Sequence, residues 1–195
     1  MKEEFIRLLQ STGRQGIDQL TEHLERLGFF TAPASTGFHL SRDGGLLEHS
    51  LNVCKTALRL RSAMIEMKPE LEERLSESSV IIATLLHDIC KSDIYIKKTK
   101  YRKDEYGRWE TYEGYDADYT HFPMGHGEKS VIMLLTLGIK LTADEMAAIR
   151  WHMSSWEMPF QSYEARSSIG AAYDKYPLVA IVQAADSMAT HILEV

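Results

Sequence analysis

Apolar residues recur every three or four positions along most of the chain, which is the spacing that buries one face of an α-helix. Helices are expected over residues 2–10 and 17–27, and Gly28 ends the second one. A longer helix is expected over residues 46–67, closed by Pro69. The pattern therefore predicts a mainly α-helical protein.

The run from Val80 to Leu86 is apolar on nearly every side, so its periodicity fits a buried strand as well as a buried helix. The flanking helical segments and the polar pair His87-Asp88 at its end favour a helix. Burying the Asp88 carboxylate without a partner would cost its hydration. A metal ion or a salt bridge must therefore compensate, and Lys91 is one candidate partner.

The C-terminal half also shows helical spacing. Thr142 and Glu145 have the spacing of a capping box, which predicts a helix start at that point. Further helices are expected over residues 131–137 and 167–173, and a last one begins at Pro177. Asp186 falls inside this last apolar helix and, like Asp88, needs a partner.

Two segments break the helical pattern. Residues 29–45 form a loop rich in Gly, Ser and Pro. Within it, His39 and Arg42 could contact a substrate or have a structural role. Two β-favouring runs near residues 94–113 flank a turn and predict a small β-hairpin. Its aromatic and basic residues fit either a solvated hairpin or a flap that receives a base and a phosphate.

A chain of 195 residues is long enough for a substantial core and fits a single domain. Residues 1–45 would supply N-terminal helices and a loop, and residues 46–192 the main helical body. The formal net charge of −6 disfavours binding to duplex nucleic acid. Small anionic substrates stay possible, because a bound metal ion can reverse the local charge.

The two cysteines, Cys54 and Cys90, lie in apolar helical stretches without zinc-type pairing, and buried free thiols are expected. The first residues lack the apolar stretch of a signal peptide. No apolar run approaches the ~20 residues that span a membrane. We therefore expect a cytoplasmic protein without a membrane partner, and the oligomeric state stays open.

Three local contexts occur in the chain in a fixed order. Gly44-Gly45-Leu46-Leu47-Glu48-His49-Ser50-Leu51 comes first, Leu85-Leu86-His87-Asp88-Ile89-Cys90-Lys91 second, and Ala184-Ala185-Asp186-Ser187 last. This order resembles the HD-domain superfamily of metal-dependent phosphohydrolases, whose pattern is H…HD…D on a helical bundle. The likeness covers roughly residues 46–190. Cys90 stands where glycine is common.

The resemblance implies a metal site. His49, His87, Asp88 and Asp186 would be ligands, and His126 and His152 lie where binuclear members add two histidines. Asp88 would then bridge two ions and take part in catalysis. The resemblance also implies an HD-like bundle into which the hairpin is inserted.

The chemistry of these side chains supports hydrolysis. Nitrogen and oxygen ligands without thiolates suit one or two divalent ions among Mn, Fe, Ni, Zn and Mg. Such ions make a metal-bound hydroxide available at neutral pH and polarise a phosphoryl oxygen. Lys91 is placed to neutralise phosphoryl charge, and Lys129 and Arg150 are further candidates for substrate binding, beside His39 and Arg42.

The function expected from the sequence is a metal-dependent phosphohydrolase, a phosphomonoesterase or phosphodiesterase, that acts on a nucleotide or another small phosphate ester. Two alternatives stay open. One is a di-iron oxygenase with the same ligand set, and the other is a non-catalytic module that binds a ligand. The sequence does not choose the substrate, the metal or the number of ions.

Overall fold

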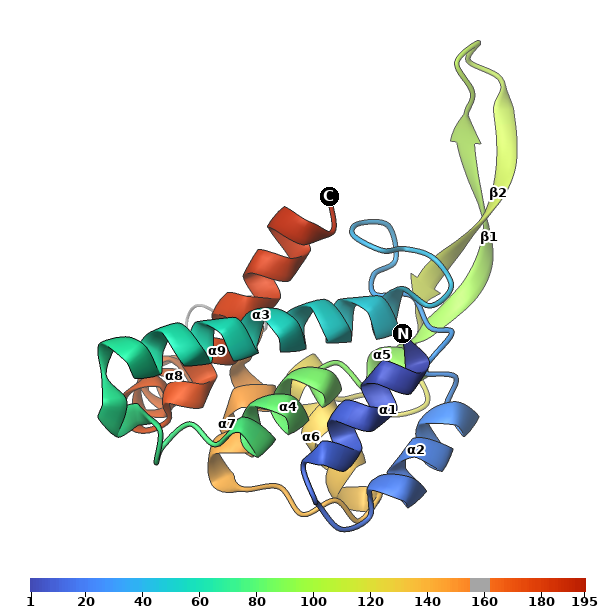
Figure 1. Cartoon of the computed structure of the whole chain (residues 1–195). Coiled ribbons are helices and arrows are strands. Elements are labelled where there is room, and N and C mark those ends of the chain that lie inside the picture. Colours follow the sequence, from blue (N-terminus) through green and yellow to red (C-terminus); the bar gives the residue numbers. More distant parts are fainter. Residues whose placement is uncertain (155–161) are drawn as a thin grey trace.

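Helix α3 (Gly45–Met67) crosses the helical body, and helices α4 (Glu77–Leu86) and α9 (Pro177–Met188) pack against it (Figure 1). The computed structural model describes residues 1–154 and 162–195. The remaining elements are α1 (Lys2–Ser11), α2 (Ile17–Arg26), the short η1 (Pro69–Leu71), α4 (Glu77–Leu86), α5 (Lys91–Ile94), β1 (Tyr95–Lys103), β2 (Trp109–Ala117), α6 (His126–Thr136), α7 (Ala143–Trp151), α8 (Tyr163–Lys175), α9 (Pro177–Met188) and the π-helical η3 (Ala189–Leu193). The expected mainly helical fold with a small β-hairpin is confirmed.

One hydrophobic core includes residues from both ends of the chain, from Phe5 in α1 to Ala189 at the end of α9. The rings of Phe5, Phe29 and Phe30 pack on one another, with centroids 5.2, 5.6 and 5.5 Å apart. Tilted and edge-on aromatic pairs of this kind add to the stabilisation from burial. The start of the loop after α2 is thereby fixed on the core, and this loop later reaches the functional site.

Helix α4 is buried on nearly all sides, which accounts for its apolar sequence. Every residue from Ser79 to Leu86 is buried, and the helix packs against α1, α3, α7 and α9. The side chain of Ser76 caps its first turn by accepting a hydrogen bond from the backbone N–H of Ser79. The preference for a helix over a strand is confirmed here. Because α4 ends inside the bundle, the residues that follow it also lie inside.

Helices α6 and α7 approach closely at Gly127. A Cβ atom there would lie 2.4 Å from the backbone oxygen of Arg150, so a larger residue would force the two helices apart. The expected capping box of Thr142 and Glu145 begins α7. The buried Glu145 carboxylate also pairs with Arg14 from the loop between α1 and α2, which ties α7 to the N-terminal helices.

The β-hairpin extends away from the helical body (Figure 1). Its strands reach Ala117, a few residues beyond the expected end near residue 113, because pairing continues to the Tyr95–Ala117 register position. Opposite charges face one another along it, as expected. Arg102 pairs with Glu110 at 2.6 Å, and Lys98 contacts Asp116 at 2.9 Å. Lys98 and Arg102 of the basic arm are therefore paired with carboxylates of the acidic arm.

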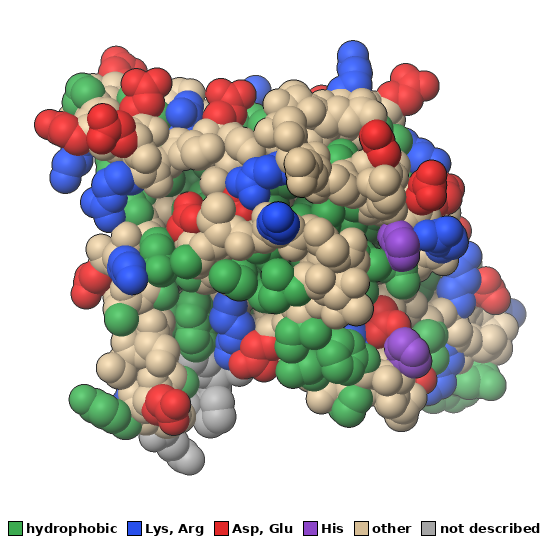
Figure 2. All heavy atoms as spheres, turned by 90° about the horizontal axis from the view of Figure 1, so that it is seen from below, with side chains coloured by type: hydrophobic (Ala, Val, Ile, Leu, Met, Phe, Trp, Pro, Cys, Tyr) green, Lys and Arg blue, Asp and Glu red, His purple; other side chains and the backbone are tan. Residues whose placement is uncertain are grey.

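The face of the molecule shown in Figure 2 carries basic and acidic side chains interspersed with one another. A mixed surface of this kind lacks the basic stripe that is typical of duplex nucleic-acid binding. Within residues 1–154 and 162–195, no helix combines the length and the apolar character that a membrane crossing requires.

Candidate metal centre

The structure brings all six expected metal ligands to one place. They come from the first turns of α3, the turn after α4, the start of α6, the end of α7 and the last part of α9: His49, His87, Asp88, His126, His152 and Asp186. Within each of three overlapping groups of these residues, the ligand atoms lie within 4.8 Å of one another. Residues far apart in the sequence therefore form one cluster of imidazoles and carboxylates.

Asp88 lies at the centre of this cluster, and its two carboxylate oxygens face different histidines. Oδ2 is 3.5 Å from Nε2 of His49 and 3.2 Å from Nε2 of His87. Oδ1 contacts Nε2 of His126 and lies 3.3 Å from Nε2 of His152. The carboxylate thus stands between two pairs of imidazoles, one on each side.

Asp186 approaches the first of these pairs. Its Oδ1 atom is 3.2 Å from Nε2 of His49, and Asp186 also groups with His87 and His152. It lies in the last turn of α9, which continues directly into η3. The partner that its carboxylate was expected to need is therefore the histidine cluster.

Each of the four histidines is held through its other ring nitrogen, Nδ1. Backbone carbonyls of Thr84 and Ile149 lie 2.7 Å and 2.6 Å from Nδ1 of His87 and His152 respectively. Nδ1 of His126 is 3.2 Å from the sulfur of Cys90, and Nδ1 of His49 contacts the carboxylate of Glu194. Fixing Nδ1 in this way orients a histidine so that Nε2 is free to bind a metal ion.

The buried charges at the centre support one another. Burial opposes ionisation of Asp88, but the positive charge of Lys91 and the neighbouring His87 and His126 hold its pKa well below the usual range. Burial likewise opposes the charge on Lys91, whereas Asp88 raises the pKa of Lys91 above its usual value. The two groups form an ion pair with Nζ 2.6 Å from Oδ2, as the sequence suggested.

The histidines divide into two electrostatic kinds. Burial alone would lower the pKa of His49, but hydrogen bonds with Asp186, Asp88 and Glu194 raise it to about 10. The pKa of His126 is also raised despite burial, through Cys90 and Asp88. Burial lowers the pKa of His87 despite the nearby Asp88 carboxylate. Metal binding replaces such imidazole protons, so ion and proton compete for the same nitrogens.

The arrangement fits a divalent cation. Since Nδ1 of His87 and of His152 points at a carbonyl oxygen, their Nε2 atoms carry lone pairs. Those lone pairs face the oxygens of Asp88 at 3.2 and 3.3 Å, and Nε2 of His152 makes no hydrogen bond to any described residue. Lone pairs on both sides repel one another unless a cation lies between them. The buried histidines and aspartates could therefore hold a divalent metal ion.

A pocket of about 1030 Å³ opens onto the cluster. Asp88, Lys91 and Asp186 line its floor, while Tyr95 and Tyr119, at the base of the hairpin, contribute aromatic walls. Lys91 is the only lysine or arginine among the lining residues in the described part of the chain. The pocket therefore combines a floor that could hold a metal ion, one buried cation and apolar walls.

The expected substrate contacts separate into two groups. Lys91 and His39 line the pocket. Arg42 instead pairs with Glu48 at the surface, and Arg150 pairs with Glu128 at 2.8 Å.

Lys129 also points away from the pocket: it is buried beside Asp93 and lies over the ring of Phe122. Arg42, Lys129 and Arg150 are not among the described residues that line the pocket, because local carboxylates hold them elsewhere.

Three residues at the site were not singled out by the sequence. Glu194 contacts His49, Cys90 contacts His126, and Tyr95 lines the pocket. Cys90 had a signal, because it stands within the segment Leu85-Leu86-His87-Asp88-Ile89-Cys90-Lys91 where glycine is common. Glu194 had none, since no motif surrounds it. Tyr95 was one of many aromatics of the hairpin segment, and only the fold distinguishes it.

Comparison with known families identifies the class of this helical metal-site protein. The family model described as HD domain matches residues 46–190. This range includes most of the chain and all six residues of the cluster. The chain therefore belongs to the HD domain family, as the resemblance of its motifs predicted.

One curated relative shares part of the sequence. The chain is 33% identical over 88 residues to a dihydroneopterin 2′,3′-cyclic phosphate phosphodiesterase from Methanocaldococcus jannaschii, a match that spans 45% of this chain and 32% of that protein. The match thus extends over about a third of the relative's length. No solved structure matches the chain at a significant level.

Proposed function

We propose that the protein is a metal-dependent phosphohydrolase that acts on a nucleotide or another small phosphate ester. The observation that carries this proposal is the position of Asp88. One of its oxygens faces His49 and His87, and the other faces His126 and His152, at the floor of an open pocket. A carboxylate between two sets of imidazoles is the arrangement that a two-ion hydrolytic centre needs.

We assign the residues to two ions. His49, His87 and Asp186 would hold one ion, His126 and His152 the other, and Asp88 would bridge both. The mixed nitrogen and oxygen set is compatible with Mn²⁺, Fe²⁺, Ni²⁺, Zn²⁺ or Mg²⁺. When bound, such ions supply Lewis acidity, which polarises a phosphoryl oxygen and makes water nucleophilic near neutral pH.

Lys91 would bind the negative charge of the phosphoryl group. Its ammonium is buried, lines the pocket and stays charged because Asp88 is 2.6 Å away. A preorganised cation in a site that excludes water stabilises developing charge more than a solvated one does. Lys91 is not one of the assigned metal ligands. Replacing it should therefore lower catalytic activity and leave metal binding intact.

The walls of the pocket support a substrate with a planar ring. Tyr95 and Tyr119 line the pocket beside the charged floor, and His39 lines it from the loop after α2. Aromatic side chains stack on heterocyclic bases without strict sequence preference. Because the relative's name states a cyclic phosphate of a pterin, 2′,3′-cyclic phosphodiesters are the first substrates that we propose to test.

The test is a phosphoester screen with the purified chain loaded with each divalent metal in turn. The panel holds 2′,3′-cyclic and 3′,5′-cyclic nucleotides, nucleoside monophosphates and the nitrophenyl mono- and diesters. We expect metal-dependent hydrolysis under anaerobic conditions with Mn²⁺, and none with an Asp88→Asn variant. If no ester of the panel is hydrolysed with any of the metals, the proposal is contradicted. Iron-dependent oxygen consumption instead would point to the oxygenase alternative.

A further inference from the structure

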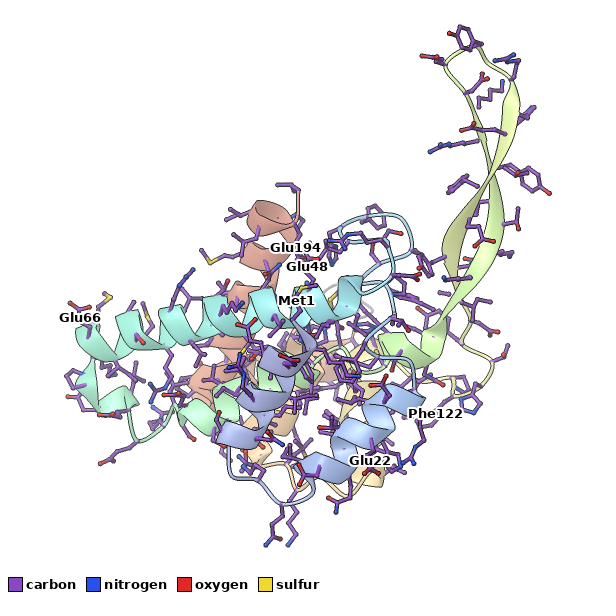
Figure 3. All side chains as sticks on the ribbon, turned by 45° about the vertical axis from the view of Figure 1, so that its right-hand side comes forward. Met1, Glu22, Glu48, Glu66, Phe122 and Glu194 are labelled. Carbon is purple, nitrogen blue, oxygen red and sulfur yellow. The ribbon has the colours of Figure 1, made fainter. Side chains whose placement is uncertain are left out.

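Glu194 lines the pocket and contacts the cluster through the second ring nitrogen of His49. Its carboxylate oxygens lie 3.1 and 3.0 Å from Nδ1 of His49, and one of them accepts a hydrogen bond of 3.0 Å from the side-chain amide of Asn52. The Glu194 side chain has no exposed surface. Figure 3 shows Glu194 on the C-terminal segment, lying over the first turns of α3 near Glu48. The carboxylate is thus fixed against α3.

The contact determines which nitrogen of His49 carries a proton. An ionised carboxylate only accepts hydrogen bonds, so Nδ1 of His49 must donate. The Nε2 atom, which faces Asp88 and Asp186, then becomes the nitrogen that can lose its proton to a metal ion. His49 and Asn52 are three residues apart on α3 and therefore share the helix face that meets Glu194.

Glu194 differs from the partners of the other three histidines. Those partners are two backbone carbonyls and the Cys90 sulfur, whereas His49 alone in this described cluster has a carboxylate at Nδ1. A negative partner raises the basicity of an imidazole and so strengthens its bond to a metal ion. His49 is therefore the ligand whose Nδ1 faces a carboxylate.

The local backbone explains how one segment reaches both sides of the His49 ring. Asp186 approaches Nε2 from α9, and the chain then enters the π-helical turn Ala189–Leu193. The N–H of Glu194 bonds to the carbonyl of Ala189, five residues earlier, at 3.1 Å. π-Helical turns occur often at functional sites. Glu194 also lies beyond residues 46–190, where the family model matches.

We propose that Glu194 is a positioning residue, which fixes the tautomer and the orientation of His49 so that Nε2 binds a metal ion. This role rests on the proposed metal centre. It adds a residue outside the family's matched range to the machinery of the site. The residue acts through Nδ1 of His49.

The test measures the affinity of the metal-free chain for Mn²⁺ by titration, independently of any activity. We expect Glu194→Ala to weaken Mn²⁺ binding about 10–100-fold, the range observed for partners of metal-ligating histidines. Glu194→Gln keeps an acceptor oxygen but loses the charge, so its effect should be smaller. In the Zn²⁺-loaded chain labelled with ¹⁵N-histidine, the Nδ1–H of His49 should be protected from exchange with water by its hydrogen bond to Glu194, and this protection should be lost in Glu194→Ala.

Glu145→Gln is the matched control, because Glu145 is a buried carboxylate whose partner, Arg14, lies outside the cluster. It should lower thermal stability and leave Mn²⁺ affinity unchanged. Wild-type affinity in Glu194→Ala, or an equal loss of affinity in Glu145→Gln, would overturn the inference while the proposed function stands. A wild-type chain that binds no divalent ion would overturn both.

Discussion

The Nε2 atoms of His49 and His87 lie 3.3 Å apart in the buried centre of the protein. At that separation, only one of the two nitrogens can carry a proton. Because Nδ1 of His87 faces the Thr84 carbonyl at 2.7 Å, the lone pair of His87 is on Nε2. Nε2 of His49 therefore donates a hydrogen bond to this lone pair, and a metal ion that binds both nitrogens must replace that proton.

Metal removal should lower thermal stability. A divalent ion at 100 times its dissociation constant stabilises the folded chain by about 2.7 kcal/mol, which for a chain of this size raises Tm by about 5–10 °C. The comparison is a thermal melt of chelator-treated protein before and after addition of Mn²⁺. The same addition should raise the Tm of Asp88→Asn by less than that of the wild-type chain. A Tm of the wild-type chain that does not respond to any divalent ion would contradict the metal site.

Lys91→Met should separate catalysis from metal binding. The substitution keeps the length of the buried side chain but removes the charge that lies 2.6 Å from Asp88. We expect kcat to fall about 10²–10³-fold, the effect of losing one group that stabilises transition-state charge. Metal content measured on the same sample should stay at the wild-type level.

Lys97→Met serves as the comparison for Lys91→Met. Lys97 lies on the exposed hairpin and pairs with Asp43 of the loop before α3, so this variant should keep its activity. Wild-type kcat in Lys91→Met would show that Lys91 has a structural role only. A large loss of bound metal in the same variant would place Lys91 in metal binding instead.

Cys90→Ala should weaken the binding of one of the two proposed metal ions. The sulfur of Cys90 is 3.2 Å from Nδ1 of His126, so its removal leaves this histidine without its orienting partner. We expect the affinity for the ion held by His126 to fall about 10-fold. Cys54→Ala removes the other buried free thiol and should not change metal affinity. Equal metal affinities in the two variants would remove Cys90 from the site.

Arg14→Met should destabilise the fold without touching the site. It would leave the fully buried Glu145 carboxylate without the guanidinium that compensates its charge. Breaking one half of a buried pair costs about 3–5 kcal/mol, which urea unfolding measures directly. Lys2→Met removes a pair with Glu25 in which both side chains are exposed, and should cost less than about 1 kcal/mol. Similar losses in the two variants would show that burial of Glu145 is unimportant.

The residues of the cluster could be predicted because motif and burial point to the same positions. Asp88 and Asp186 each place a carboxylate in an apolar helical context, and this context alone indicates that a compensating group must lie nearby. His126 and His152 carried no such signal of their own, and their positions followed from the resemblance to a binuclear family. The fold brings them within contact of Asp88 because α6 and α7 approach closely at Gly127.

The supporting residues could not be predicted in the same way. Arg42, Lys129 and Arg150 have the charge that binds phosphate, but each contacts a carboxylate that the sequence does not place beside it. Glu194 is eight residues beyond Asp186, and only the π-helical turn brings it to His49. Contacts between distant segments depend on packing, which periodicity does not encode.

The number of divalent ions per chain tests the central claim most directly. Elemental analysis and native mass spectrometry of the Mn²⁺-loaded protein should give two ions per chain, with Asp88→Asn losing both or retaining one. That result would support Asp88 as the bridge between the two pairs of histidines. A single ion in the wild-type chain, with His126→Ala and His152→Ala binding it as tightly, would contradict the two-ion centre.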